Sequence, residues 1–135
     1  DTLTLKGPLG FFVINAAEME DHHYYFIATG VGISPFLSFI KSYPDLDYTL
    51  LHGIRFDHEA YRSDQVPGER KILCTSRDQT GDYHGRVTGY IRDKNLLDPR
   101  GIYYLCGNSA MIEDVSGYLE DHGIDPFFIR SEVFF

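Results

Sequence analysis

The sequence predicts an α/β fold of the doubly wound type, in which helices cover both faces of a five-stranded parallel sheet. The chain has 135 residues, which is about the size of one domain. Short apolar runs rich in β-branched and aromatic residues alternate with segments of helical periodicity. The runs are apolar at nearly every position, as expected for strands buried on both faces of a parallel sheet. Right-handed crossovers between such strands place helices on both faces.

Five apolar runs are the expected strands. In chain order they are residues 24–28 (YYFIA), 48–53 (YTLLHG), 71–75 (KILCT), 102–106 (IYYLC) and 126–130 (PFFIR). Their aromatic and β-branched residues favour extended backbone, and glycine or polar residues mark the end of each run. We therefore expect the loops after the first four runs to meet at the carboxyl edge of the sheet, where open α/β sheets bind their ligands.

Helical segments fill the intervals between the strands. The clearest is residues 110–122, in which apolar residues recur at helical spacing up to the terminating Gly123. Residues 35–41 repeat this spacing more briefly, and residues 57–62 and 87–92 fit short helices. The sequence contains no internal repeat and no long linker, so the elements are expected to pack as one unit.

Composition and charge exclude several function classes. Apolar residues make up 43% of the chain, which is too many for a disordered protein. The formal net charge of −8 argues against binding nucleic acid or an anionic membrane. No apolar run is long enough for a transmembrane helix, and no signal peptide is recognisable. Two cysteines are too few for a disulfide framework, so we expect a reducing compartment, the cytoplasm.

A phosphate-binding turn is expected after the first strand. Thr29 leads into Gly30 and Gly32, which let backbone N–H groups approach an anion closely. Ser34 suits the N-cap of the following helix and Pro35 its first position. The free N–H groups of that helix N-terminus would suit a pyrophosphate. Pro35 stands where the third glycine of a G-x-G-x-x-G pattern belongs, so a tight turn that binds nothing is the alternative.

Arginines stand at strand ends where dinucleotide-binding folds that use NAD usually carry an Asp or Glu. Arg55 follows the second strand, Arg77 follows the third with Ser76 beside it, and Arg86 comes shortly afterwards. Guanidinium groups bind phosphate through paired hydrogen bonds, each worth roughly 1.5–3 kcal/mol. In an acidic chain this grouping favours the 2′-phosphate of NADP. The alternative is solvent-facing arginines paired with neighbouring acids such as Asp78.

Two further segments carry candidate reactive or stacking groups. Cys106 closes the fourth strand just before a Gly-Asn-Ser turn, whereas Cys74 fits an ordinary buried cysteine. Glu132 follows the fifth strand and suits proton or charge handling near a redox centre. The terminal Phe134 and Phe135 suit stacking on a flat cofactor, or docking of a last strand against the sheet.

In this order, these segments resemble the ferredoxin–NADP reductase family, specifically its nucleotide-binding half. The matching stretches are GPLGFF at 7–12, IATGVGISPF at 27–36, LLHGIR at 50–55, TSRD at 75–78, YHGRVT at 83–88, YLCGNSAMI at 104–112 and SEVFF at the end. The combination is specific and covers essentially the whole chain. It implies a Rossmann-like NADP-binding domain of the ferredoxin reductase type.

The resemblance implies a role for each matching residue. The cofactor-binding residues, from the pyrophosphate turn through the 2′-phosphate site to the nicotinamide groove and the flavin, are Thr29, Gly30, Gly32, Arg55, Ser76, Arg77, Arg86, Gly107, Asn108, Met111, Phe134 and Phe135. The implied catalytic residues are Cys106, beside the nicotinamide, and Glu132, the family's C-terminal acid. Phe134 matches the aromatic that stacks on the flavin, but Phe135 follows it, so which ring stacks stays open.

The family holds its FAD mainly on an N-terminal antiparallel barrel with an R-x-Y-S type motif, which these residues lack. We therefore expect residues 1–17 to be the tail end of such a barrel and residues 18–135 to be the NAD(P)-binding domain. The resemblance implies hydride transfer between NADPH and FAD, with electrons passing to a ferredoxin, a flavodoxin or another redox carrier. The 135 residues alone are expected to bind NADP(H) and to catalyse little.

Two alternatives stay open. A NADH-dependent reductase component of an oxygenase, or of another electron-transfer chain, would share the fold and can also carry arginines in these loops. A non-catalytic nucleotide-binding module would bind the nucleotide without transferring hydride. Because ferredoxins and flavodoxins are typically acidic, the basic docking face for such a carrier is expected outside these acidic residues.

Overall fold

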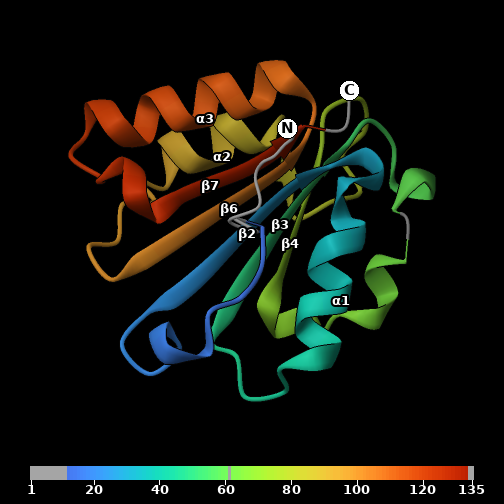
Figure 1. The fold of residues 1–135 in the computed structure, drawn as a ribbon. Coiled ribbons are helices and arrows are strands. Elements are labelled where there is room, and N and C mark those ends of the chain that lie inside the picture. Colours follow the sequence, from blue (N-terminus) through green and yellow to red (C-terminus); the bar gives the residue numbers. More distant parts are fainter. Residues whose placement is uncertain (1–11, 61, 134–135) are drawn as a thin grey trace.

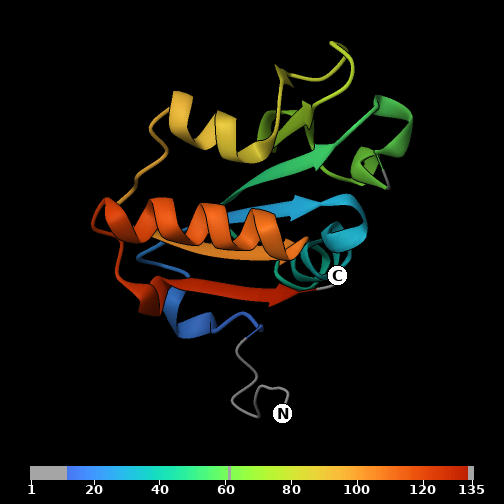
Figure 2. The ribbon, with the colours of Figure 1, turned by 90° about the horizontal axis from the view of Figure 1, so that it is seen from above.

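The computed structural model describes residues 12–60 and 62–133, in which six parallel strands form one sheet with helices on both faces (Figure 1). The strands are β2 (His23–Thr29), β3 (Tyr48–Ile54), β4 (Lys71–Thr75), β5 (Tyr83–His84), β6 (Gly101–Gly107) and β7 (Ile129–Val133). Their spatial order is β5-β4-β3-β2-β6-β7, and every neighbouring pair is parallel. Figure 2 shows the arrowheads of β2, β3 and β7 pointing the same way. The predicted doubly wound α/β fold is confirmed.

The sheet has one strand more than the sequence predicted. The additional strand, β5, consists of two residues that pair with Cys74 and Thr75 at the end of β4. A strand of this length carries no detectable alternation, so only its pairing with β4 defines it.

The last strand begins three residues later than predicted. The Asp125 carboxylate accepts a hydrogen bond of 2.9 Å from the Phe127 N–H. Together with Pro126, whose ring fixes φ, this contact turns Pro126–Phe128 into a short 3-10 helix, η6. The aromatic residues that suggested a strand therefore belong to η6, and β7 follows it.

The winding of the chain reverses at β2. From β2 the chain moves outward through β3, β4 and β5, and it then crosses to the other side of β2 to form β6 and β7. The loops that follow β2 and β6 leave the sheet toward opposite faces at this switch point. Doubly wound sheets open a crevice at such a place, beyond the carboxyl ends of the strands.

Two hydrophobic layers explain why the strands are apolar throughout. On β2, Tyr24 and Phe26 pack in the layer under α1 (Ser34–Ser42), and Tyr25 and Ile27 pack in the layer under α2 (Val87–Asp93) and α3 (Ser109–Asp121). Figure 1 shows α1 on one face and α2 with α3 on the other. Consecutive side chains of a strand point to opposite faces, so a sheet covered on both sides buries every one of them.

The helix predictions are confirmed with one exception. The structure has α2 and α3 where they were expected, and Gly123 follows α3 with φ +97°, a conformation that favours glycine. Within the described residues of the segment 57–62, the helical part is a single 3-10 turn, η3 (Asp57–Glu59). Further 3-10 turns are η1 (Ala16–Glu18), η4 (Ser63–Gln65) and η5 (Gly68–Arg70). None of the helices in the described part of the chain has the length and apolar character that a membrane crossing requires.

An ion pair between Glu18 and Arg130 joins the first described segment to the start of β7. Two guanidinium nitrogens of Arg130 each donate to a carboxylate oxygen of Glu18 at 2.9 Å. Arg130 also donates to the hydroxyl of Tyr104 at 3.1 Å, and that hydroxyl donates to the Val13 carbonyl at 2.6 Å. These contacts fix the entering chain against β6 and β7 at the amino end of the sheet.

Candidate functional site

A groove of about 610 Å³ opens at the carboxyl edge of the sheet. It runs along the loops that follow β2, β3, β4 and β6, which the sequence predicted as the binding edge. The loop after β5 adds to it. Eight predicted site residues line it: Thr29, Gly30, Arg55, Ser76, Arg77, Arg86, Asn108 and Met111. Four others, Gly32, Cys106, Gly107 and Glu132, do not line it, and Phe134 and Phe135 lie outside the described residues.

The turn after β2 differs from the predicted one. Gly30–Ile33 forms a 3-10 helix, η2, that runs directly into α1. Ile33 already has helical φ and ψ and Ser34 makes no capping hydrogen bond, so the predicted N-cap role of Ser34 is wrong. The continuous helical stretch begins at Gly30, whose φ of 54° favours glycine. The N–H groups left without a helical partner are therefore those of η2, at the groove.

Close packing between two loops holds this turn in place. A side chain on Gly32 would overlap the backbone of Cys106, and one on Gly107 would overlap Thr29. The Asn108 N–H donates to the Thr29 hydroxyl at 2.9 Å. Gly32 and Gly107 thus allow the loops after β2 and β6 to approach each other behind the groove.

His52, which the sequence analysis missed, supports the same turn from β3. Its side chain is fully buried, and its Nε2 lies 2.7 Å from the carbonyl oxygen of Gly30. The available signal was a histidine inside an otherwise apolar strand.

The three arginines lie on successive loops of the carboxyl edge. Backbone hydrogen bonds extend the β3–β4 pairing past the strand ends, with the Arg77 N–H donating to the Arg55 carbonyl at 2.8 Å. Arg86 precedes α2 as its N-cap residue. All three side chains are exposed and border the groove. The topology therefore gathers them at one place.

Arg55 is paired, although with Glu59 and not with Asp78. Its Nη2 lies 2.7 Å from Oε2 of Glu59, and its backbone N–H donates to Oε1 of the same side chain at 3.1 Å. The hydrogen bond to Arg55 lowers the pKa of Glu59, so that this carboxylate is charged at neutral pH. Glu59 lines the groove and was missed, because one 3-10 turn brings it back to Arg55. Among the described residues, neither Arg77 nor Arg86 forms an ion pair.

Asp78 shapes its own loop instead of neutralising Arg77. Partial desolvation acts to raise its pKa, but hydrogen bonds from the Asp57 N–H and from Thr80 outweigh it and lower the pKa of Asp78 to about 2. The carboxylate accepts these bonds at 3.1 Å from Asp57 and at 2.8 Å from the Thr80 hydroxyl. The Asp78 carboxylate therefore accepts hydrogen bonds from groups of the surrounding loops.

The N-terminus of α3 lines another part of the groove. Asn108 is its N-cap, and its side-chain oxygen accepts hydrogen bonds from the N–H groups of Ala110 and Met111 at 2.8 and 3.2 Å. Asn108, Ala110, Met111 and Asp114 line the groove from this helix. A helix N-terminus carries partial positive charge, which favours an anion nearby.

The two predicted catalytic residues are neighbours beside the groove. Cys106 at the end of β6 pairs in register with Glu132 on β7. Cys106 is fully buried in the layer under α1, whereas Glu132 is exposed. Burial, followed by the charge of Glu132, raises the pKa of the Cys106 thiol to about 12, so it is protonated at neutral pH. Cys74 is buried as expected, and both cysteines are free.

Comparison with known proteins finds a matching family model and related reductase proteins. Residues 26–117 match the family model described as the oxidoreductase NAD-binding domain. The chain is 29% identical over 138 residues to the toluate 1,2-dioxygenase electron transfer component of Pseudomonas putida, covering 93% of this chain and 40% of that protein. It is 26% identical to the ferredoxin–NADP reductase of Pseudomonas aeruginosa, covering 76% of this chain and 50% of the relative. The chain thus spans half or less of the length of these relatives.

Solved structures share the fold at lower identity. A cytochrome P450 reductase from Amycolatopsis superimposes with a TM-score of 0.75 at 22% identity, over 95% of this chain and 42% of that one. The ferredoxin–NADP⁺ reductase of Plasmodium falciparum, solved with 2′P-AMP, has a TM-score of 0.63 at 21% identity, over 90% of this chain and 55% of that one. The family match covers most of the sheet and the groove between its loops, and the chain therefore belongs to the oxidoreductase NAD-binding domain family.

Proposed function

We propose that this chain is the nucleotide-binding half of a flavoprotein reductase that transfers hydride between NADPH and FAD and passes electrons to a ferredoxin- or flavodoxin-like carrier. The observation that carries the proposal is the groove itself, in which a glycine turn and a helix N-terminus at the switch point and three arginines on the adjoining loops line one carboxyl edge of the sheet. The two relatives named as an electron transfer component and as a ferredoxin–NADP reductase support the same assignment.

Each part of the groove suits one part of a dinucleotide. The turn at Thr29 and Gly30 offers N–H groups to the pyrophosphate, and the N-terminus of α3 adds its partial positive charge nearby. Arg77 and Arg86, on the far loops, suit the 2′-phosphate of the adenosine because neither forms an ion pair within the described residues. The nicotinamide end would then lie toward the end of β6, near Cys106.

FAD, when bound, supplies the conversion between hydride and single-electron transfer. The residues that the resemblance assigns to it, Phe134 and Phe135, lie outside the described part, and we propose that a preceding barrel, ending at about residue 17, holds most of it. Glu132, exposed near the end of β7, is the group that we propose for charge or proton handling beside the flavin. The thiol of Cys106 is fully buried and protonated, so it is poorly suited to proton transfer.

A second candidate is a NADH-dependent reductase, as in the electron transfer component of an oxygenase. The Arg55–Glu59 pair favours it. Glu59 places a charged acceptor at the groove, close to where NAD-binding folds use an acid to bind the ribose 2′-hydroxyl. The same carboxylate would repel a 2′-phosphate. Its ion pair with Arg55 would also compete with the phosphate for that guanidinium.

Calorimetric titration of the 135-residue chain with NADP⁺ and NAD⁺ tests the proposal. We expect both nucleotides to bind, NADP⁺ more tightly, and Arg77→Ala to weaken NADP⁺ roughly tenfold or more while leaving NAD⁺ unchanged. Lys41→Ala, on the exposed side of α1, is the matched control. Equal affinities that Arg77→Ala does not alter would exclude the NADPH assignment, and binding of neither nucleotide would exclude the site. Stopped-flow flavin reduction in a longer chain that contains the barrel separates a reductase from a non-catalytic nucleotide-binding module.

A further inference from the structure

His52 is a buried titratable group for which the proposed function gives no role. It lies on β3, with Ala28 of β2 and Leu73 of β4 as its register neighbours, and its side chain has no exposed surface. A polar side chain in this position costs stability unless it is hydrogen-bonded. Within the described part of the chain, its hydrogen-bond partner is the Gly30 carbonyl in the turn beside the groove.

The contact fixes the protonation of the imidazole. A carbonyl oxygen accepts, so Nε2 carries the hydrogen and donates to Gly30 across 2.7 Å. Nδ1 is buried and has no hydrogen-bond partner among the described residues. Burial lowers the pKa of His52, an effect that the hydrogen bond to Gly30 opposes and the nearby charge of Lys71 reinforces. His52 is therefore neutral at neutral pH, with Nε2–H as its one donor.

This hydrogen bond determines which way one peptide group faces. In a trans peptide, the carbonyl of residue i and the N–H of residue i+1 point in opposite directions. Because His52 holds the Gly30 carbonyl toward β3, the Val31 N–H points away from the imidazole. Gly30 and Val31 both line the groove, and the first N–H groups of a helix have no partner within it.

We propose that His52 is a positioning residue, whose Nε2–H holds the Gly30–Val31 peptide so that the Val31 N–H is presented to the nucleotide pyrophosphate. The inference rests on the proposed nucleotide site. Glycine at position 30 suits the positive φ of this turn but has no side chain to restrain the peptide. The imidazole supplies the restraint that the glycine cannot, and it does so from a strand in the centre of the sheet.

A matched pair of variants in the 135-residue chain tests this role. His52→Gln keeps an N–H donor at about the reach of Nε2, whereas His52→Met has similar bulk and no donor. We expect His52→Met to weaken NAD⁺ binding roughly tenfold, the value of one hydrogen bond, and His52→Gln to restore most of the affinity. Binding of 2′-AMP, which carries the adenosine and its 2′-phosphate but no pyrophosphate, should be equal in all three chains.

The possible outcomes separate this inference from the proposed function. If wild type binds no dinucleotide, the proposed site is wrong and this role falls with it. Suppose that wild type binds NAD⁺. The positioning role alone is then wrong if His52→Met binds NAD⁺ equally well, or if its affinities for NAD⁺ and 2′-AMP fall by the same factor. If His52→Met does not fold, the amide ¹⁵N–¹H signal of Val31 in the wild-type chain decides: it must shift on addition of NAD⁺, and an unmoved signal would overturn the proposal.

Discussion

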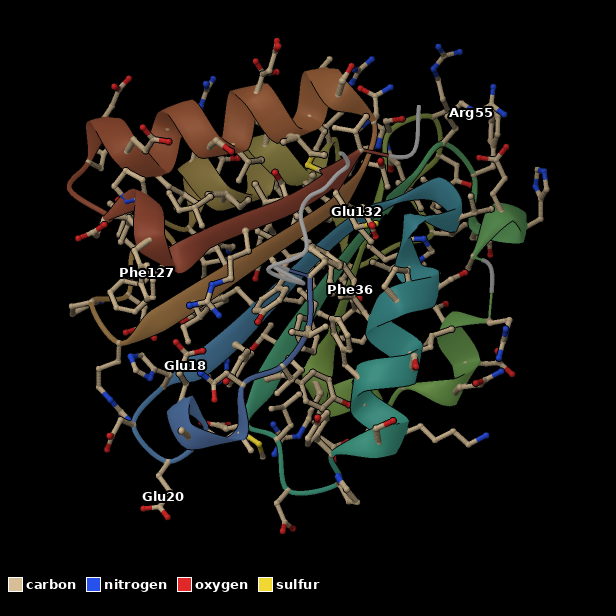
Figure 3. The ribbon with its side chains drawn as sticks, viewed as in Figure 1. Glu18, Glu20, Phe36, Arg55, Phe127 and Glu132 are labelled. Carbon is tan, nitrogen blue, oxygen red and sulfur yellow. The ribbon has the colours of Figure 1, made fainter. Side chains whose placement is uncertain are left out.

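Two arginine–glutamate pairs lie at opposite ends of the sheet and have opposite surroundings. Glu18 and Arg130 are 112 residues apart, and their side chains are 16% and 14% exposed. Arg55 and Glu59 are four residues apart, with side chains 65% and 27% exposed. Figure 3 labels Glu18 near the amino end of the strands and Arg55 near the carboxyl end.

The same ionic chemistry serves two purposes in these places. The Arg130 guanidinium is also bonded to Tyr104 and lies over the rings of Tyr104 and Phe127, so its position is fixed by several elements at once. The Arg55–Glu59 pair is local and solvated, and either partner can exchange the other for a ligand at little cost. The amino end of the sheet is thus fixed by buried contacts, whereas the carboxyl end keeps solvated charged groups at the proposed nucleotide site.

The largest effect is expected from Glu18→Gln. It leaves the guanidinium of Arg130 largely buried without its counter-ion, which costs about 3 kcal/mol of unfolding free energy, the lower end of the range for buried pairs. Urea denaturation measures the loss. Glu20→Gln is the control, because Glu20 is exposed on the same segment (Figure 3). Equal stability of the two variants would contradict the distinction between the pairs.

The same pair predicts how stability depends on pH. The hydrogen bonds from Arg130 lower the pKa of Glu18 below its unfolded value, which is about 4.3. The contribution of Glu18 is therefore complete above about pH 5 and is lost as the pH falls through the lowered pKa. The stability difference between wild type and Glu18→Gln should be constant near neutral pH and shrink in acid. If this stability difference instead grew on acidification, the ionised form of Glu18 would not be the stabilising one, and the prediction would be wrong.

An intermediate effect is expected at the groove from Asn108→Ala. The side chain caps α3 through two backbone N–H groups, and loss of such a cap costs about 1 kcal/mol. Urea denaturation should show this loss, and Asn108→Asp, which keeps an acceptor, should retain most of the stability. A loss as large as that of Glu18→Gln would show that the carboxyl end is as rigidly determined as the amino end.

The smallest change in stability is expected from Glu59→Gln. Both partners are solvated, so the melting temperature should hardly move. Release of Arg55 from its carboxylate should instead strengthen NADP⁺ binding several-fold relative to NAD⁺, as measured by calorimetric titration. Glu69→Gln, another exposed acid beside an arginine outside the groove, is the control. An unchanged NADP⁺/NAD⁺ ratio would show that Glu59 has no influence on nucleotide choice.

The sequence alone determined the fold class, the positions of most strands and the loops that form the groove. These are consequences of local patterns, since apolar runs of strand length, glycines and helical spacing all act over a few residues. Parallel topology then brings the carboxyl ends together, so the convergence of Arg55, Arg77 and Arg86 could be expected before any contact was known.

Other features were decided only by contacts between distant segments. Pairing with β4 creates β5, and the turn after β2 packs closely against the backbone of Cys106. The partner of Arg55, the burial of Cys106 and the hydrogen bond from His52 to Gly30 depend on the distances between side chains in the folded chain. A residue's type determines which groups it can bind. Only tertiary packing determines which of those groups lies within reach and whether the side chain is exposed to water.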